Sequence, residues 1–99
     1  MEWFKEYIKS AMEEIRGARE YAEKYCEHKR IGEVTVSNKY RDMSKQEMGH
    51  ASQLLDMACT STEDGEDGHA MKMMCSWIRE ELDEDKADIM RMLDHTGSW

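Results

Sequence analysis

Apolar residues in the first third of the chain recur every three or four positions, with Glu, Lys and Arg between them. This spacing matches the 3.6-residue period of an α-helix and predicts a long amphipathic helix over residues 3–30. Gly17 weakens such a helix by roughly 1 kcal/mol relative to Ala, and it is compatible with the close approach of a neighbouring backbone. The apolar positions are Phe4, Ile8, Ala11, Ile15, Ala18, Ala22 and Tyr25.

Two further periodic segments follow. The first predicts a helix over residues 33–60, with a core-facing stripe of Val36, Tyr40, Met43, Glu47, His50, Leu54 and Met57. A short strand at residues 34–36 is rejected because no second strand is present to pair with it. After a polar loop at residues 60–68, the third helix is predicted over residues 69–95, with Met71, Met74, Cys75, Ile78, Leu82, Ile89, Met92 and Leu93 along its stripe. The expected fold is an all-α, three-helix antiparallel bundle in one domain, residues 1–99.

Composition narrows the classes of function. The 99 residues carry a formal charge of −8, which argues against nucleic acid or an anionic membrane as the direct partner and leaves cations and basic protein surfaces open. No apolar run is long enough to span a bilayer, and no export signal is evident. Cys26, Cys59 and Cys75 lack any C-x-x-C spacing and fall at apolar positions, so we interpret them as buried thiols in a reducing, cytoplasmic setting.

Glu47-Met-Gly-His50 is the motif with the clearest chemical content. Residues three apart share one face of a helix, so this pair can offer a carboxylate and an imidazole to one ion. Glu14 lies on the inner stripe of the first helix. If the turn is centred near Gly32, Glu14 precedes it by as many residues as His50 follows it, and an antiparallel hairpin brings the two to one height.

The same count applied to the third helix selects Glu81 as the acid at this level. Asp85, one turn further along the apolar stripe, is the reserve candidate. The expected metal ligands are therefore Glu14, Glu47 and His50, with Glu81 or Asp85 completing the set.

These residues also resemble a known family. Glu14, followed by Ala18 and Tyr21 and later by Glu47-x-x-His50-Ala51, is similar to the ferritin-like superfamily, in particular to small rubrerythrin-like and half-ferritin chains of bacteria and phages. The resemblance covers about residues 2–58. It implies that Glu14 is the ligand from the first helix, that Glu47 and His50 are the pair from the second, and that the protein handles iron or zinc.

The chain departs from the family pattern, because a full di-iron site uses four helices and two Glu-x-x-His motifs. Two interpretations remain open: one chain holds a single iron or zinc ion, or two chains pair to complete the site. In a purely structural alternative, Glu14 and Glu47 only hydrogen-bond His50 and Tyr21. If a metal is bound, Tyr21 is the expected hydrogen-bond partner of its ligands. Enzymatic turnover is left open, and ferroxidase-type activity requires a dinuclear centre.

The sequence therefore supports two hypotheses for the function of the protein. The first is a ferritin-like metal-binding protein. The second is an acidic phage-type interaction protein or inhibitor, similar in principle to anti-CRISPR proteins, which occupies a basic surface and uses the metal only to lock its helices. A homodimer is expected because the third helix is apolar on two sides, the second being formed by Met73, Trp77 and Met90.

Overall fold

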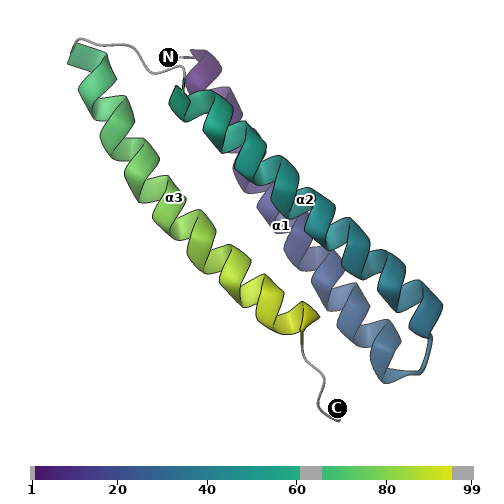
Figure 1. Ribbon diagram of the computed structural model, residues 1–99. Coiled ribbons are helices and arrows are strands. Elements are labelled where there is room, and N and C mark those ends of the chain that lie inside the picture. Colours follow the sequence, from purple (N-terminus) through teal and green to yellow (C-terminus); the bar gives the residue numbers. More distant parts are fainter. Residues whose placement is uncertain (1, 61–65, 95–99) are drawn as a thin grey trace.

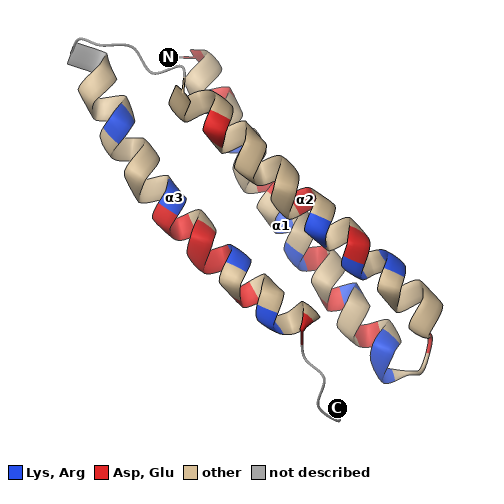
Figure 2. Ribbon diagram, in the orientation of Figure 1, with Lys and Arg blue, Asp and Glu red and all other residues tan. Residues whose placement is uncertain are grey.

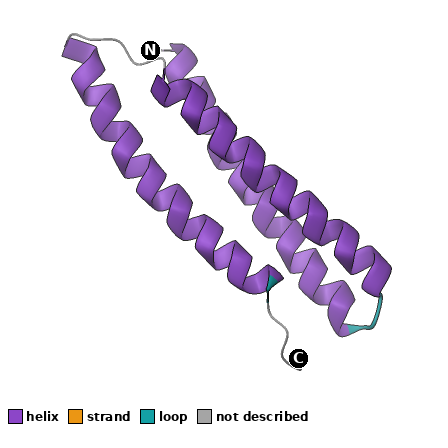
Figure 3. Ribbon diagram, in the orientation of Figure 1, coloured by secondary structure: helices purple, strands orange, loops and turns teal. Residues whose placement is uncertain are grey.

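The protein folds into three long α-helices joined by short connections (Figures 1 and 3). The computed structural model describes residues 2–60 and 66–94. Helix α1 spans Glu2–Arg30, α2 spans Val34–Thr60 and α3 spans Glu66–Leu93. Helix α1 packs against both α2 and α3. The predicted all-α three-helix bundle is confirmed. The predicted start of the third helix at residue 69 is wrong by three residues, since α3 begins at Glu66 within the segment predicted as loop. Residues 61–65 of that loop and the predicted helix end at residue 95 lie outside the described residues.

The turn between α1 and α2 is defined by backbone hydrogen bonds. The amide of Gly32 donates to the carbonyl of Lys29 at 3.1 Å, and the amide of Glu33 donates to the carbonyl of His28 at 2.9 Å. This is the Schellman arrangement, which requires a left-handed residue just after the helix. Gly32 supplies it with a φ of 85°, and α1 therefore ends where the sequence predicted.

Small residues form the interface between α1 and α2. Ala11, Ala18 and Ala22 are completely buried on α1, as are Ser44 and Ala51 on α2. Because these side chains are short, the two helices lie close enough for the hydroxyl of Ser44 to donate a 2.7 Å hydrogen bond to the carbonyl of Ala18. The serine is thus satisfied inside the interface instead of lying unpaired in the core.

The predicted core stripe of α2 is wrong by one residue. The residues that are buried lie one position further along than those predicted, and they are Ser37, Ser44, Met48, Ala51, Leu55 and Ala58. Val36, Met43 and Met57 are instead at least 37% exposed. A one-residue shift rotates a helix by about 100°. The face of α2 that is buried carries mainly small Ser and Ala side chains, and the larger apolar residues lie beside it. Small side chains contribute little to the hydrophobic pattern of the sequence, so the pattern indicated the wrong face.

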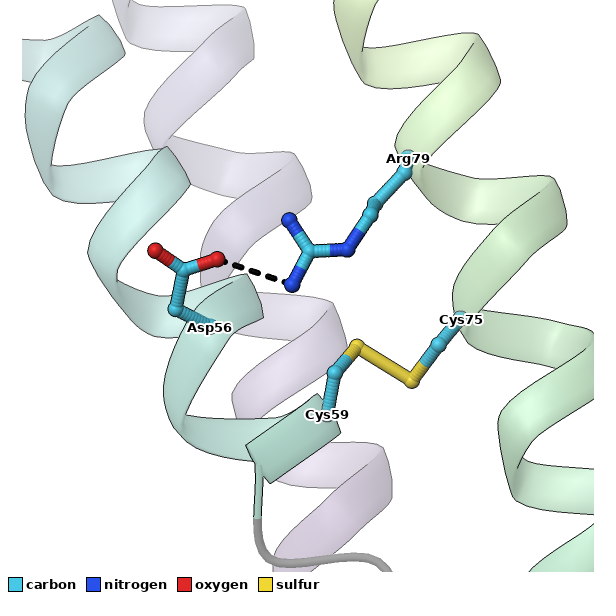
Figure 4. Close-up of a disulfide and its surroundings, with 4 residues drawn as sticks. All are labelled: Asp56, Cys59, Cys75 and Arg79. Atoms are coloured by element: carbon cyan, nitrogen blue, oxygen red, sulfur yellow. Dashed lines mark ion pairs between the residues drawn. A yellow bond between two sulfur atoms is a disulfide. The ribbon is translucent and has the colours of Figure 1, made fainter.

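Helix α3 is fastened to the hairpin along its length. A disulfide joins Cys59 of α2 to Cys75 of α3, and Arg79 forms an ion pair with Asp56 at 2.8 Å one turn away (Figure 4). Near the other end, the Cys26 thiol contacts the carbonyl of Met92 at 3.7 Å. The interpretation of all three cysteines as reduced thiols is therefore wrong for Cys59 and Cys75. Only Cys26 is free, and burial raises the pKa of its thiol.

No described helix combines the length and the hydrophobicity that a membrane-spanning segment needs.

The buried residues of α3 follow one stripe of the helix, as the sequence predicted, but Met74, which was predicted on this stripe, is 38% exposed. The buried residues include Met71, Cys75, Leu82, Ile89 and Leu93.

Candidate metal centre

Three potential metal ligands meet on the α1–α2 hairpin. Glu14, Glu47 and His50 each direct one ligand atom into a group whose members all lie within 4.8 Å of one another. Within residues 2–60 and 66–94 this is the one group of at least three such side chains. The structure thus brings together the three residues on which the sequence prediction rested.

The distances between these atoms are close to the distances between ligand atoms that surround one bound metal ion. His50 Nδ1 lies 3.8 Å from Glu14 Oε2. Ligand atoms bound at about 2.0–2.2 Å from a common ion lie roughly 3.3–3.6 Å apart when the geometry is tetrahedral. The His50–Glu14 pair is a few tenths of an ångström wider than this, and no pair of ligand atoms in the group is more than 4.8 Å apart. The His50 side chain is 55% exposed, so its ring has room to move toward the carboxylates.

The two carboxylates are held in an unfavourable arrangement for anions. Glu14 Oε2 is buried and has no hydrogen-bond partner among the described residues. The pKa of Glu47 is raised, mainly by its hydrogen bond with Glu14 and then by burial, while His50 acts in the opposite direction. No described Lys or Arg forms an ion pair with either carboxylate. A cation between the two carboxylates would relieve their repulsion.

Gly17 makes room for Glu47. A Cβ atom at this position would lie 3.3 Å from Glu47 Oε2 and 3.8 Å from its Cδ, which is a tight contact. Gly17 follows Glu14 by three residues and lies on the same flank of α1. The sequence indicated only that Gly17 permits a close approach, and the group that approaches is the Glu47 carboxylate.

The candidates on α3 do not join this group. Asp85 pairs with Arg19 at 3.5 Å, so the side of α1 that bears Arg19 faces α3. Glu14 and Arg19 are five residues apart, which places them about 140° apart around the helix axis. Glu81 is exposed on α3. A count of residues along the helices predicts the height of these acids in the bundle, but it does not predict which way their side chains point. The three-residue group lies on the side of the hairpin that α3 does not cover.

Tyr21 packs against aromatic rings at the α1–α2 interface. Its ring stacks on that of Tyr40, with the centroids 6.1 Å apart, and the ring of His28 also stacks on Tyr40, at 5.3 Å. Among the described contacts, Tyr21 makes no hydrogen bond to Glu14 or Glu47. A hydrogen bond from Tyr21 to the ligands of a bound metal therefore stays a prediction.

Comparisons with protein-family models, with curated proteins and with solved structures found no match for this chain. The resemblance to the ferritin-like superfamily therefore stays a prediction that rests on Glu14, Glu47 and His50 and their spacing.

Proposed function

We propose that the protein binds one divalent transition-metal ion, zinc or ferrous iron, through Glu14, Glu47 and His50. The observation that supports this most directly is the buried Glu14 Oε2, which has no hydrogen-bond partner and lies beside a second carboxylate and an imidazole nitrogen. Two carboxylates and one neutral imidazole form a ligand set used for both metals. A bound ion would give the unpaired oxygen a partner and would offset the repulsion between the Glu47 and Glu14 carboxylates.

Binding has a mechanical consequence, because the ligands come from two helices. Glu14 belongs to α1, and Glu47 and His50 belong to α2. An ion held by both helices ties them together near their middle, where the interface consists of small side chains. Three protein ligands leave further coordination positions for water or for another molecule. The resemblance to ferritin-like chains is consistent with this proposal, and chemistry with oxygen is not part of it.

A second copy of the chain is a suitable neighbour for the same open side. Met43 and Met57 are 37% and 49% exposed on the flank of α2 that bears Glu47 and His50, and Leu54 is partly buried between them. A two-fold dimer through this flank would bring two ligand groups to a shared axis. Light scattering of the metal-loaded protein should then give about twice the chain mass of 11.7 kDa. A monomer at tens of micromolar would limit the site to one chain.

Metal titration tests the site itself. Protein freed of metal by a chelator is titrated with Co²⁺, whose visible absorption reports its ligands, and then with Zn²⁺ in competition. We expect one equivalent to bind. Glu14→Gln, Glu47→Gln and His50→Ala should each weaken binding by roughly ten- to a hundredfold or more, since each removes a ligand.

Matched controls separate this site from general acidity. Glu13→Gln removes one charge beside Glu14 on the exposed side of α1, and Glu81→Gln and Asp85→Asn test the α3 acids. These three variants should bind Co²⁺ within about twofold of the parent protein, a difference well below 1 kcal/mol. Equal weakening in the controls and the ligand variants would refute the proposed site.

A further inference from the structure

The outward face of α3 exposes large apolar side chains in its first half. Met73 is 62% exposed, Trp77 is 68% exposed and Met74 is 38% exposed. At 100° per residue these three side chains fall on one face of the helix, away from the stripe of Met71, Cys75 and Leu82 that is buried against the hairpin. We call Met73, Met74 and Trp77 the α3 patch.

The same face becomes acidic in the next two turns. Glu80, Glu81 and Glu84 follow Trp77 by three, four and seven residues and are exposed. Figure 2 shows this part of α3 as a mostly red run, preceded by tan segments with isolated blue ones. Among the described residues no ion pair engages these three glutamates. Like charges four residues apart on a helix, such as Glu80 and Glu84, lower its stability, and a cationic partner would relieve that repulsion.

We propose that this face of α3 is a docking surface for a basic amphipathic helix of another protein. Leucine-like or aromatic side chains of that helix would cover the α3 patch, and Lys or Arg side chains would lie over Glu80, Glu81 and Glu84. From Met73 to Glu84 the surface is about 17 Å long, or three helical turns. Methionine side chains are flexible and polarisable, which suits them to contacts with partners of varied shape.

The sequence predicted a second copy of the chain on this face, but Met90 instead packs against the core, and two further properties favour a basic helix over a second copy. A stable dimer buries about 800 Å² on each partner, whereas the α3 patch consists of three partly exposed side chains. In a two-fold contact through this face, a second copy would also bring its own Glu80, Glu81 and Glu84 close to those of the first. A short basic helix needs less area, and its charge is complementary.

The test uses the whole chain with its disulfide intact. The probe is a synthetic amidated peptide with leucines along one helical face and lysines along the other. A peptide of the same composition, whose leucines follow no helical period, is the control ligand. Isothermal titration calorimetry at low and at physiological salt gives the affinities. We expect the amphipathic peptide to bind at least about tenfold more tightly than its scramble.

Variants then locate the binding site. Met73→Gln combined with Trp77→Gln should weaken binding by roughly tenfold or more, because it removes the anchors of the contact. Glu80→Gln, Glu81→Gln and Glu84→Gln together should weaken it at low salt and flatten its salt dependence. All five positions are exposed, so far-ultraviolet circular dichroism and the melting temperature should stay close to those of the parent protein.

A charge-matched variant controls for simple attraction to an acidic protein. Glu20→Gln, Glu23→Gln and Glu27→Gln remove three exposed carboxylates from α1 and should change the affinity by less than about threefold. An equal loss in both triple variants would overturn the proposal, as would the absence of any preference for the amphipathic peptide. Self-association that the Trp77 variant abolishes would also overturn it, since it would assign this face to a second copy.

Discussion

Replacing Gly17 with Ala should raise the stability of the metal-free protein and weaken its affinity for metal. Gly17 lies inside α1, where Ala is favoured over Gly by about 1 kcal/mol. The added Cβ would lie 3.3 Å from Glu47 Oε2, so this oxygen has to retreat by a few tenths of an ångström. The carboxylate is the free end of a flexible side chain, and without metal it can move at little cost.

With metal the same movement is costly. Glu47 must remain within about 2.2 Å of the ion to act as a ligand, and the methyl group added by Gly17→Ala would occupy the space behind it. We expect a loss of about tenfold in affinity, equivalent to roughly 1.4 kcal/mol. Urea unfolding with a chelator measures the first effect, and competition between the protein and a chromophoric chelator for Zn²⁺ measures the second.

Gly49 provides the matched control. It lies between Glu47 and His50 on α2, and a Cβ atom there would meet nothing within 4 Å. Gly49→Ala should therefore gain about the same helix stability and keep the metal affinity of the parent protein. If the Gly17 and Gly49 variants bind metal equally well, the carboxylate does not hold the position inferred from the structure.

Three further predictions concern stability. The raised pKa of Glu47 means that the folded state holds a proton more tightly than the unfolded chain. With chelator present, the protein should therefore gain stability relative to Glu47→Gln as the pH falls through the raised pKa of Glu47 toward the ordinary value of 4.5, and it should lose this gain as the pH rises. A difference in melting temperature that does not depend on pH would contradict this prediction. Reducing the Cys59–Cys75 disulfide, which spans 16 residues, should lower the free energy of unfolding in a urea titration by about 3 kcal/mol. In the same titration, the double variant Cys59→Ser plus Cys75→Ser should not respond to dithiothreitol. Ser44→Ala should cost about 1 kcal/mol by removing the buried hydrogen bond to Ala18, and an unchanged urea midpoint would mean that this bond does not contribute.

The periodicity of the sequence predicted the buried face of those helices whose buried residues are large. Helices α1 and α3 bury Phe4, Ile15, Leu82 and Ile89, and their stripes were assigned correctly from the sequence except at Met74, which is exposed. Helix α2 was assigned the wrong face, because its buried Ser37 and Ser44 look polar in a sequence while the exposed Met43 and Met57 look apolar. Hydrophobic patterning measures the size and polarity of a side chain, and it does not detect an interface that is selected for close approach.

The candidate site depended on two kinds of inference with different outcomes. The spacing of Glu47 and His50, together with the count from the turn to Glu14, predicted which groups meet, because the rise of a helix is constant. The assignment of Glu81 and Asp85 required the rotation of α3 about its axis, and a count of residues contains no such information. The disulfide escaped prediction because the pairing of Cys59 with Cys75 depends on how α3 packs beside α2.

The positions of the three cysteines limit how this chain can be oxidised incorrectly. Cys26 lies near the turn between α1 and α2, and Cys59 lies near the far end of α2, so about 21 residues of helix, or roughly 32 Å, separate their levels. A disulfide requires Cα atoms within about 7 Å, and the native pair has them 5.9 Å apart. Once the α1–α2 hairpin has formed, Cys26 is too far away to compete for Cys59. The folded hairpin thus prevents the non-native disulfide between Cys26 and Cys59. A chain that contains this disulfide would have been oxidised before its hairpin formed.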